Sequence, residues 1–310
     1  MPDDDLSPRA SPAAPAAPST PPPGEATDPH SRLLRCSLCV EESRSYWAHV
    51  DPTDPRGSAA TAFVDSWFGT KSEAWTTELL SNMRVRFDPF PAALDVLSRW
   101  RAMPPDVRRL VCHFHLQLTD PLYRAFTGTF LAERRDALRA DVHRQSVNQW
   151  VADHGPPRWA LKTRLQFASR LLSCALAAGL LRGKRDPREA VAPRVPDDAL
   201  AYLLYVLRHL DFQGSLVRNP YLSSLGLVGG HLADRLRALH ALEFRQIGDA
   251  HEIEWRYPDV TAWADAELPL VAAHASHPGS GPAAPSAPPA TTGATTGDTA
   301  TTSGREATHP

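Results

Sequence analysis

Two cysteines at a short spacing are the first candidates for chemistry in this chain. Cys36 and Cys39 enclose Ser-Leu, which is the spacing of half a structural zinc site. A tetrahedral site needs two further ligands, and no second pair of matching spacing follows. Cys112, His113 and His115 have suitable side chains, but the two histidines would point about 200° apart on a helix. We therefore predict no metal site and no cofactor.

Motifs that carry enzyme active sites are absent from the sequence. It contains no nucleophile elbow, phosphate loop, HExxH motif or dinucleotide-binding glycine pattern. Gly226, Gly229 and Gly230 form a lone cluster that indicates a turn between helices. The acidic residues are dispersed and mostly stand beside arginines, which favours solvated or ion-paired carboxylates. We therefore expect no catalytic residues.

The strongest indication of a function is a cluster of basic residues. Residues 158–188 contain eight basic side chains and one acidic side chain, Asp186. Cations after a helix C-terminus also stabilise the helix dipole, so a plain helical hairpin with a solvated face remains an alternative. Basic side chains typically contact phosphates, whereas an amide side chain can read a base edge. The residues that we expect to contact nucleic acid are Arg158, Lys162, Gln166, Arg170, Arg182, Lys184 and Arg185.

Two expected helices position this cluster. The first spans residues 137–154 and ends at Gly155-Pro156-Pro157, and the second spans residues 159–180. A short helix, a tight turn and a longer amphipathic helix form the outline of a helix-turn-helix. We expect the polar stripe of the second helix to lie opposite its apolar stripe, which repeats every 3.6 residues. The apolar stripe consists of Leu161, Leu165, Ala168, Leu172, Ala175 and Leu176.

The rest of the core reads as helices separated by proline and glycine. Thr119-Asp120-Pro121 is a helix N-terminal signature, a capping residue followed by proline. The expected helices span residues 59–68, 73–84, 89–101, 106–118, 121–133, 197–210 and 229–241, with a short helix or ordered loop at 219–227. Only 244–247 and 252–257, which flank the turn dipeptide Gly248-Asp249, read as strands. The fold class is therefore mainly α with one C-terminal β-hairpin.

The order of these last elements, three helical stretches and a hairpin, is that of a winged helix. The hairpin tip, Gly248-Asp249-Ala250-His251, offers phosphate little. We therefore place a structural or protein-contacting role for the hairpin ahead of a role as a DNA-contacting wing.

Composition divides the chain into five regions. We expect disordered tails at 1–30, which hold nine prolines, and at 269–310, because neither buries enough apolar surface to offset the entropy of ordering. Between them we expect an N-terminal helical domain at 31–135, the helix-turn-helix region at 136–196, and helices plus hairpin at 197–268. Apart from the tails, the core keeps 31 basic and 28 acidic residues, an excess too small to predict a nucleic-acid partner by itself.

Targeting signals are absent, and we expect a cytoplasmic protein that does not enter a membrane. The acidic, proline-rich start is not a signal peptide. The longest apolar run, 171–181, is interrupted by Ser173 and Gly179 and is too short to span a bilayer. Four cysteines without a secretory signal indicate reduced thiols.

Two segments resemble a known family. They are Asp120-Pro121-Leu122-Tyr123-Arg124-Ala125-Phe126 and the segment from Trp159 through Thr163-Arg164, Leu171-Leu172-Ser173 and Leu176 to Gly179-Leu180-Leu181 and Gly183. Both resemble the BrxA family of small proteins from BREX phage-defence systems, and the similarity spans about residues 60–260. The resemblance implies a multi-helical fold related to the NusB antitermination factor and binding to double-stranded DNA. It also implies work alongside a methyltransferase, an ATPase and a phosphatase-like protein, with no catalytic residues.

These observations favour a DNA-binding accessory subunit of a BREX-type defence system. Two alternatives stay open at this stage. One is a scaffold whose helices dock partner proteins without touching DNA, and the other is an RNA-binding factor of the antitermination kind.

Overall fold

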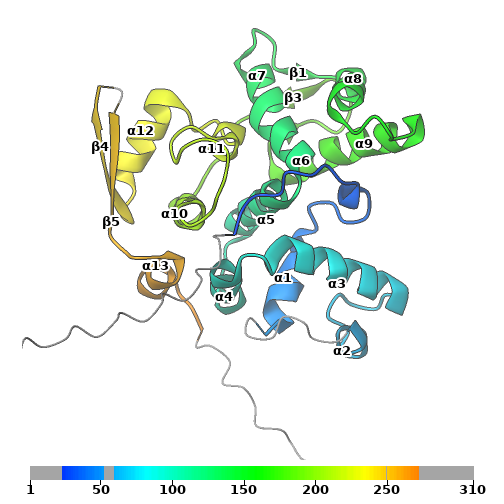
Figure 1. Ribbon diagram of the computed structural model, residues 1–310, viewed down its shortest axis with the longest axis horizontal. Coiled ribbons are helices and arrows are strands. Elements are labelled where there is room, and N and C mark those ends of the chain that lie inside the picture. The colour runs from blue at the N-terminus through cyan, green and yellow to red at the C-terminus, as the bar shows by residue number, and fades with distance from the viewer. Residues whose placement is uncertain (1–22, 52–58, 249, 272–310) are drawn as a thin grey trace, which may run out of the picture. The chain divides into compact units, whose positions relative to one another are not determined.

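The computed structural model describes residues 23–51, 59–248 and 250–271, and most of both expected tails lies outside these ranges. The described chain is mainly helical, as predicted (Figure 1). Its N-terminal helices are η1 (Arg32–Leu34), α1 (Val40–His49), α2 (Ala59–Val64), α3 (Glu73–Phe87), α4 (Pro91–Arg99) and α5 (Pro105–Thr119). No helix within the described residues is long and apolar enough to cross a membrane.

The second half alternates helices with short strands. Its helices are α6 (Pro121–Ala125), η2 (Phe126–Phe130), α7 (Leu131–Asp136), α8 (Arg144–His154), α9 (Leu161–Ala178), α10 (Asp197–Leu207), α11 (Pro220–Ser224), α12 (Gly229–Ala238) and α13 (Val260–Glu267). Its strands are β1 (Asp141–Val142), β2 (Leu181–Arg182), β3 (Arg188–Ala190), β4 (Leu242–Ile247) and β5 (Ala250–Trp255).

Local sequence signals explain where several helices begin and end. The predicted cap at Asp120 is confirmed: its Oδ1 accepts a hydrogen bond from the Tyr123 backbone N–H at 2.9 Å, with Pro121 at the first helical position. Asn219 caps α11 in the same way, accepting from the Leu222 N–H at 2.9 Å. At the other end of a helix, Gly179 adopts φ 81° and closes α9, a conformation that favours glycine.

Helix α5 lies at the centre of the core and contacts α1, α3, α6, α9 and α10. Its two histidines are buried and face different neighbours, as helix geometry predicted. His113 hydrogen-bonds the Tyr123 hydroxyl (2.9 Å) and the Ser224 hydroxyl (3.0 Å), whereas His115 hydrogen-bonds the Tyr202 hydroxyl (2.7 Å). Burial lowers the pKa of both imidazoles to about 3, so both are neutral members of polar contacts that join α5 to α6, α10 and α11.

The expectation of a single β-hairpin was wrong. β4 and β5 form the predicted hairpin, with Phe244 opposite Ile253, but β1, β3 and β2 form a second, three-stranded antiparallel sheet. In this sheet Asp141 lies opposite Glu189, and Leu181 lies opposite Ala190. Strands of two or three residues are too short to show the period of two that reveals a strand in sequence.

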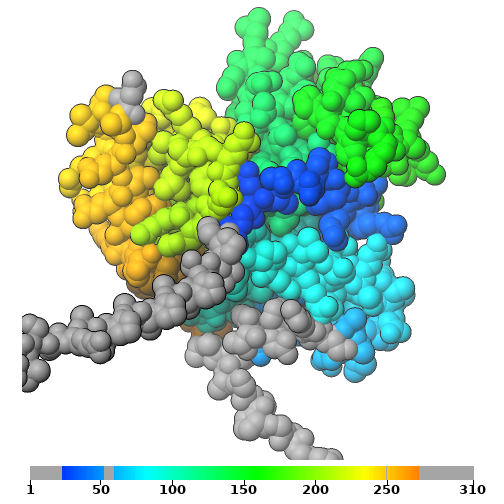
Figure 2. Space-filling view, viewed as in Figure 1, coloured from blue at the N-terminus to red at the C-terminus, as the bar shows by residue number. Residues whose placement is uncertain are grey.

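Three helices and one ordered segment were also missed. η1, α1 and α13 lie outside the expected helices. Residues 23–30, expected within the N-terminal tail, are held against the core. The Glu25 N–H donates to the Asp211 carbonyl (3.0 Å), and the Ala26 N–H donates to the Leu118 carbonyl (2.8 Å). In Figure 2 the chain from residue 23 onward, in dark blue, runs across the surface between the cyan and the green helices.

Candidate nucleic-acid interface

Helices α8 and α9 pack against each other, and residues 155–160 connect them (Figure 1). The connection is anchored by Trp159, a buried side chain whose ring lies 4.8 Å from that of Phe167 on α9. On α8, Trp150 packs against the rings of Phe126 and Phe130 at 5.5 and 6.0 Å. Aromatic contacts therefore fix the connection to α9 and fix α8 to the π-helical turn η2.

The predicted contact residues of α9 lie on one exposed side of the helix. Lys162, Gln166 and Arg170 are exposed and follow one another at intervals of four residues, with Ser173 continuing the same side. Helix α9 contains no acidic residue. No ion pair engages Lys162 or Arg170 in the ranges that the structure describes. A phosphate could therefore reach both cations without displacing a carboxylate.

The apolar stripe expected opposite this side is buried only in part. Leu161 is 70% exposed and Leu165 is 42% exposed, so neither belongs to the core. The residues of α9 that are buried are Phe167, Ala168, Leu171, Leu172, Cys174, Ala175 and Ala178. Ala168, Leu172 and Ala175 of the expected stripe are buried, and the core stripe widens from them toward Phe167, Leu171 and Cys174. Leu161 and Leu165 point to the same side as Leu172 but lie in the first turns of α9, before its first buried residue.

A shallow groove of 540 Å³ runs beside this side of α9. Lys162, Gln166 and Arg170 line it together with Ser169, Leu161 and Leu165, and Leu34 of η1 lines it from outside the helix. Three of the seven residues expected to contact nucleic acid therefore line one groove, and Leu34, which was not expected, lines it with them. No sequence pattern could indicate Leu34, because more than 120 residues of chain separate it from α9.

The other four expected residues do not join this groove. Arg158 is exposed just before α9, whereas Arg182, Lys184 and Arg185 are exposed in β2 and the turn after it, beyond the other end of the helix. Since α9 has 18 residues, the two groups are separated by about 27 Å of helix. The seven residues therefore form a line along α9 rather than one compact patch.

Ion pairs reduce the positive charge at the far end of this line. Arg182 Nη1 lies 3.2 Å from Glu189 Oε2, and Arg188 pairs with Asp186. Asp186 Oδ2 also accepts the Arg144 N–H at 2.7 Å. The basic cluster was counted over residues 158–188, a range that ends one residue before Glu189. The count therefore overstated the excess of positive charge. Lys184 and Arg185 keep exposed side chains that no described carboxylate pairs with.

The β4–β5 hairpin carries the opposite charge. Its strands hold Glu243, Glu252 and Glu254 against a single cation, Arg245, which is paired with Glu243 at 3.3 Å. A surface of this charge repels phosphate, so the hairpin is unsuited to contact DNA as a wing. Ile247, next to the tip, is 78% exposed.

No family model and no curated protein matches this chain. Among solved structures, the chain is similar to an uncharacterized protein from Magnetospirillum magneticum. The two chains are 17% identical and superpose with a TM-score of 0.47, and the match covers 59% of this chain and 98% of the other.

Proposed function

We propose that this protein is a non-enzymatic subunit that binds double-stranded DNA through the exposed side of α9. The observation that carries the proposal is the row of Lys162, Gln166 and Arg170 along a helix without acidic residues. Electrostatic attraction to phosphate supplies most of the affinity of such surfaces, whatever the sequence of the DNA.

The three side chains of this row would divide the work of binding. Lys162 and Arg170 would contact phosphates, because both carry a full charge and no described carboxylate competes for them. Gln166 lies between them and can form paired hydrogen bonds with adenine in the major groove. Lys162 and Gln166 occupy the first two turns of α9, where the second helix of a helix-turn-helix meets base edges.

The resemblance to the BrxA family extends this proposal to a role in a BREX-type phage-defence system. In that role the protein would work as an accessory subunit in the cytoplasm beside a methyltransferase, an ATPase and a phosphatase-like protein. The acidic β4–β5 hairpin with its exposed Ile247 is the surface that we propose for contact with such a partner. Within this proposal the helix pair α8–α9 acts as a helix-turn-helix, and α10 to β5 adopts a winged-helix arrangement on a NusB-like helical core.

Salt dependence of DNA affinity tests the contact by α9. Each lost phosphate contact lowers the slope of log affinity against log salt by about 0.9 for duplex DNA. Replacing Lys162 and Arg170 together with alanine should therefore weaken binding to all duplexes alike and flatten the slope by nearly 2. Fluorescence anisotropy with a labelled duplex at several salt concentrations measures both quantities.

A matched control removes two arginines elsewhere. Arg44 and Arg237 are exposed and lie in helical ion pairs with Glu41 and Asp234. The double variant R44A/R237A loses the same net charge, so it should keep the slope of the parent protein. If K162A/R170A binds DNA with the parent's affinity and slope, α9 is not the contact and the scaffold alternative stands. If RNA of equal length competes better than duplex DNA, the antitermination-like alternative replaces the proposal.

A further inference from the structure

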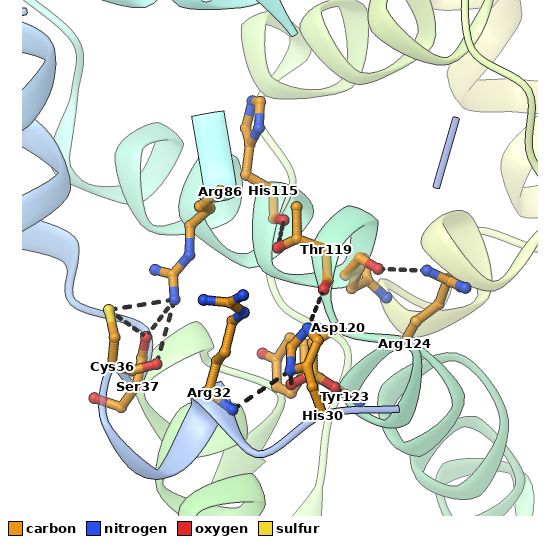
Figure 3. A network of polar contacts seen from close by, with 11 residues as sticks. His30, Arg32, Cys36, Ser37, Arg86, His115, Thr119, Asp120, Tyr123 and Arg124 are labelled. Atoms are coloured by element: carbon orange, nitrogen blue, oxygen red, sulfur yellow. Dashed lines mark hydrogen bonds and ion pairs between the residues drawn. The ribbon is translucent and has the colours of Figure 1, made fainter. Parts of the chain in front are cut away.

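The loop before α1, which carries Cys36 and Cys39, holds one end of a buried arginine, and Figure 3 shows Cys36 and Ser37 of this loop against Arg86. Arg86 of α3 extends its guanidinium into this loop, where Nη2 lies 3.5 Å from Cys36 Sγ. A hydrogen bond links the Cys39 thiol to the Cys36 sulfur, and Ser37 Oγ lies 3.8 Å from Cys39 Sγ. Cys36 is 2% exposed and Cys39 is only partly buried, so an oxidant has to approach the Cys36 sulfur past Cys39.

Arg86 is a fully buried cation without a carboxylate partner in the described chain. Its guanidinium donates to the backbone carbonyls of Leu38 (2.9 Å), Ser37 (2.8 Å) and Cys36 (3.3 Å). Carbonyl oxygens satisfy the N–H donors but do not neutralise the charge. A buried charge is costly unless an opposite charge lies near it, and the nearest group that can supply one is the Cys36 thiol. The arrangement therefore favours a thiolate at Cys36.

From this geometry we propose that Cys36 and Cys39 form a redox-active dithiol that hydroperoxides oxidise to an intramolecular disulfide. Cys36 is the attacking thiolate, Arg86 stabilises it, and Cys39 is the thiol that closes the disulfide. The inference does not rest on DNA binding, and it concerns a site distinct from the exposed side of α9.

The reaction has two steps. The Cys36 thiolate attacks hydrogen peroxide: the O–O bond breaks, an S–O bond forms, and hydroxide leaves and takes up a proton to become water. This step oxidises the sulfur to a sulfenic acid and reduces the peroxide. Cys39 sulfur then attacks the sulfenic sulfur: the S–O bond breaks, the S–S bond forms, and the Cys39 proton leaves with the second water.

The charged surroundings support this assignment of roles. The pKa of Cys36 is lowered to about 7, first by the hydrogen bond from Cys39 and then by the charge of Arg86. Burial, Glu42 of α1 and Cys174 of α9 act in the opposite direction but are outweighed. The same hydrogen bond and burial raise the pKa of Cys39 well above its usual range. Oxidation of Cys36 to the sulfenic acid removes the thiolate that accepts this hydrogen bond. As the Cys39 sulfur then attacks, its proton passes to the departing hydroxide.

The two remaining cysteines provide an internal contrast. Cys112 and Cys174 are fully buried, and burial raises the pKa of each thiol to about 12. Both should remain protonated and unreactive at neutral pH. If peroxide oxidises Cys36 and Cys39 but not Cys112 and Cys174, the reaction is the proposed one and not a general oxidation of the protein.

Thiol counting on the full-length protein tests the proposal. The reduced protein is exposed to a small excess of hydrogen peroxide, denatured, and titrated for free thiols. We expect the four thiols of the chain to fall to two and to return to four after dithiothreitol. Peptide mass spectrometry should identify the Cys36–Cys39 linkage. The variant C39S should instead accumulate a sulfenic acid at Cys36 that dimedone traps.

Two further variants make the outcome decisive. C112A/C174A should lose both of its remaining thiols at the parent's rate, whereas C36S should lose none. Arg86→Lys keeps a charge but loses the forked contacts, so we expect the midpoint of Cys36 alkylation by iodoacetamide to rise above its parent value near pH 7. The proposal is overturned if four thiols persist in peroxide, if the linkage involves Cys112 or Cys174, or if Cys36 in the parent alkylates with an ordinary midpoint of about 8.5.

Discussion

At the scale of single residues, two leucines of α9 differ in what they contribute to stability. Leu172 is 2% exposed and Leu165 is 42% exposed. Leu172→Ala should lower the free energy of unfolding by about 2–5 kcal/mol, because it leaves a cavity in a packed core. Leu165→Ala should cost less than about 1 kcal/mol, because surface substitutions usually change stability by no more than about 0.5 kcal/mol. Urea unfolding of the two variants measures both values. Equal losses of unfolding free energy would contradict the finding that Leu172 is buried and Leu165 is exposed.

At the scale of elements, the packing of η2 on α11 depends on the absence of a side chain at Gly128. A Cβ at this position would lie 2.4 Å from Pro220 Cβ and 2.5 Å from the Pro220 carbonyl oxygen. Alanine in a helix is normally more stable than glycine by about 1 kcal/mol. Here we expect Gly128→Ala to destabilise the protein by about 2 kcal/mol or more, because the two backbones must move apart.

Gly230 of α12 is the matched control for this substitution. A Cβ there would meet nothing within 4 Å, so Gly230→Ala should be neutral or should stabilise by up to about 1 kcal/mol. Thermal unfolding of both variants under one condition compares them directly. A Gly128→Ala variant that is as stable as Gly230→Ala would show that η2 and α11 do not approach this closely.

At the scale of the whole molecule, the segment at residues 23–30 connects distant parts of the chain. Glu25 and Arg124 form an ion pair at 3.3 Å, and their side chains are 7% and 10% exposed. The Tyr221 hydroxyl of α11 donates to the same carboxylate. Glu25→Gln should therefore lower the free energy of unfolding by about 3 kcal/mol, because it leaves a charged arginine buried without its partner. For a protein of this size, such a loss lowers the melting temperature by about 6–12 °C.

An exposed pair in α12 provides the comparison. Asp234 and Arg237 are 77% and 51% exposed, and Asp234→Asn should change stability by less than about 1 kcal/mol because solvent screens the pair. Calorimetry of the two variants at equal salt measures the difference. A shortened chain that begins at residue 31 should lose at least as much stability as Glu25→Gln. If it melts with the full chain, residues 23–30 do not contribute to the fold.

Interactions between residues close together in the chain were predictable from the sequence. The cap at Asp120, the stop at Gly179 and the turn between β4 and β5 all depend on residues within about four positions of one another. For the same reason the mainly helical fold class and the placement of Lys162, Gln166 and Arg170 on one side of α9 followed from residue types and the period of the helix.

The side of α9 that enters the core was decided only by tertiary structure. Apolar residues cover more than half of its circumference, so the sequence left open which stripe is buried and how far along the helix it extends. The packing of α5, α8 and η1 buries the side that includes Phe167, Leu171 and Leu172 and leaves the first turns, with Leu161 and Leu165, exposed. Contacts between distant positions were equally hidden. Arg86 meets Cys36 across 50 residues, and Glu25 meets Arg124 across a longer span. Such pairs leave no pattern among neighbouring residues of the sequence. Bringing the two residues together costs the entropy of closing the intervening chain, and the packing of the whole core offsets this cost, not the pair itself.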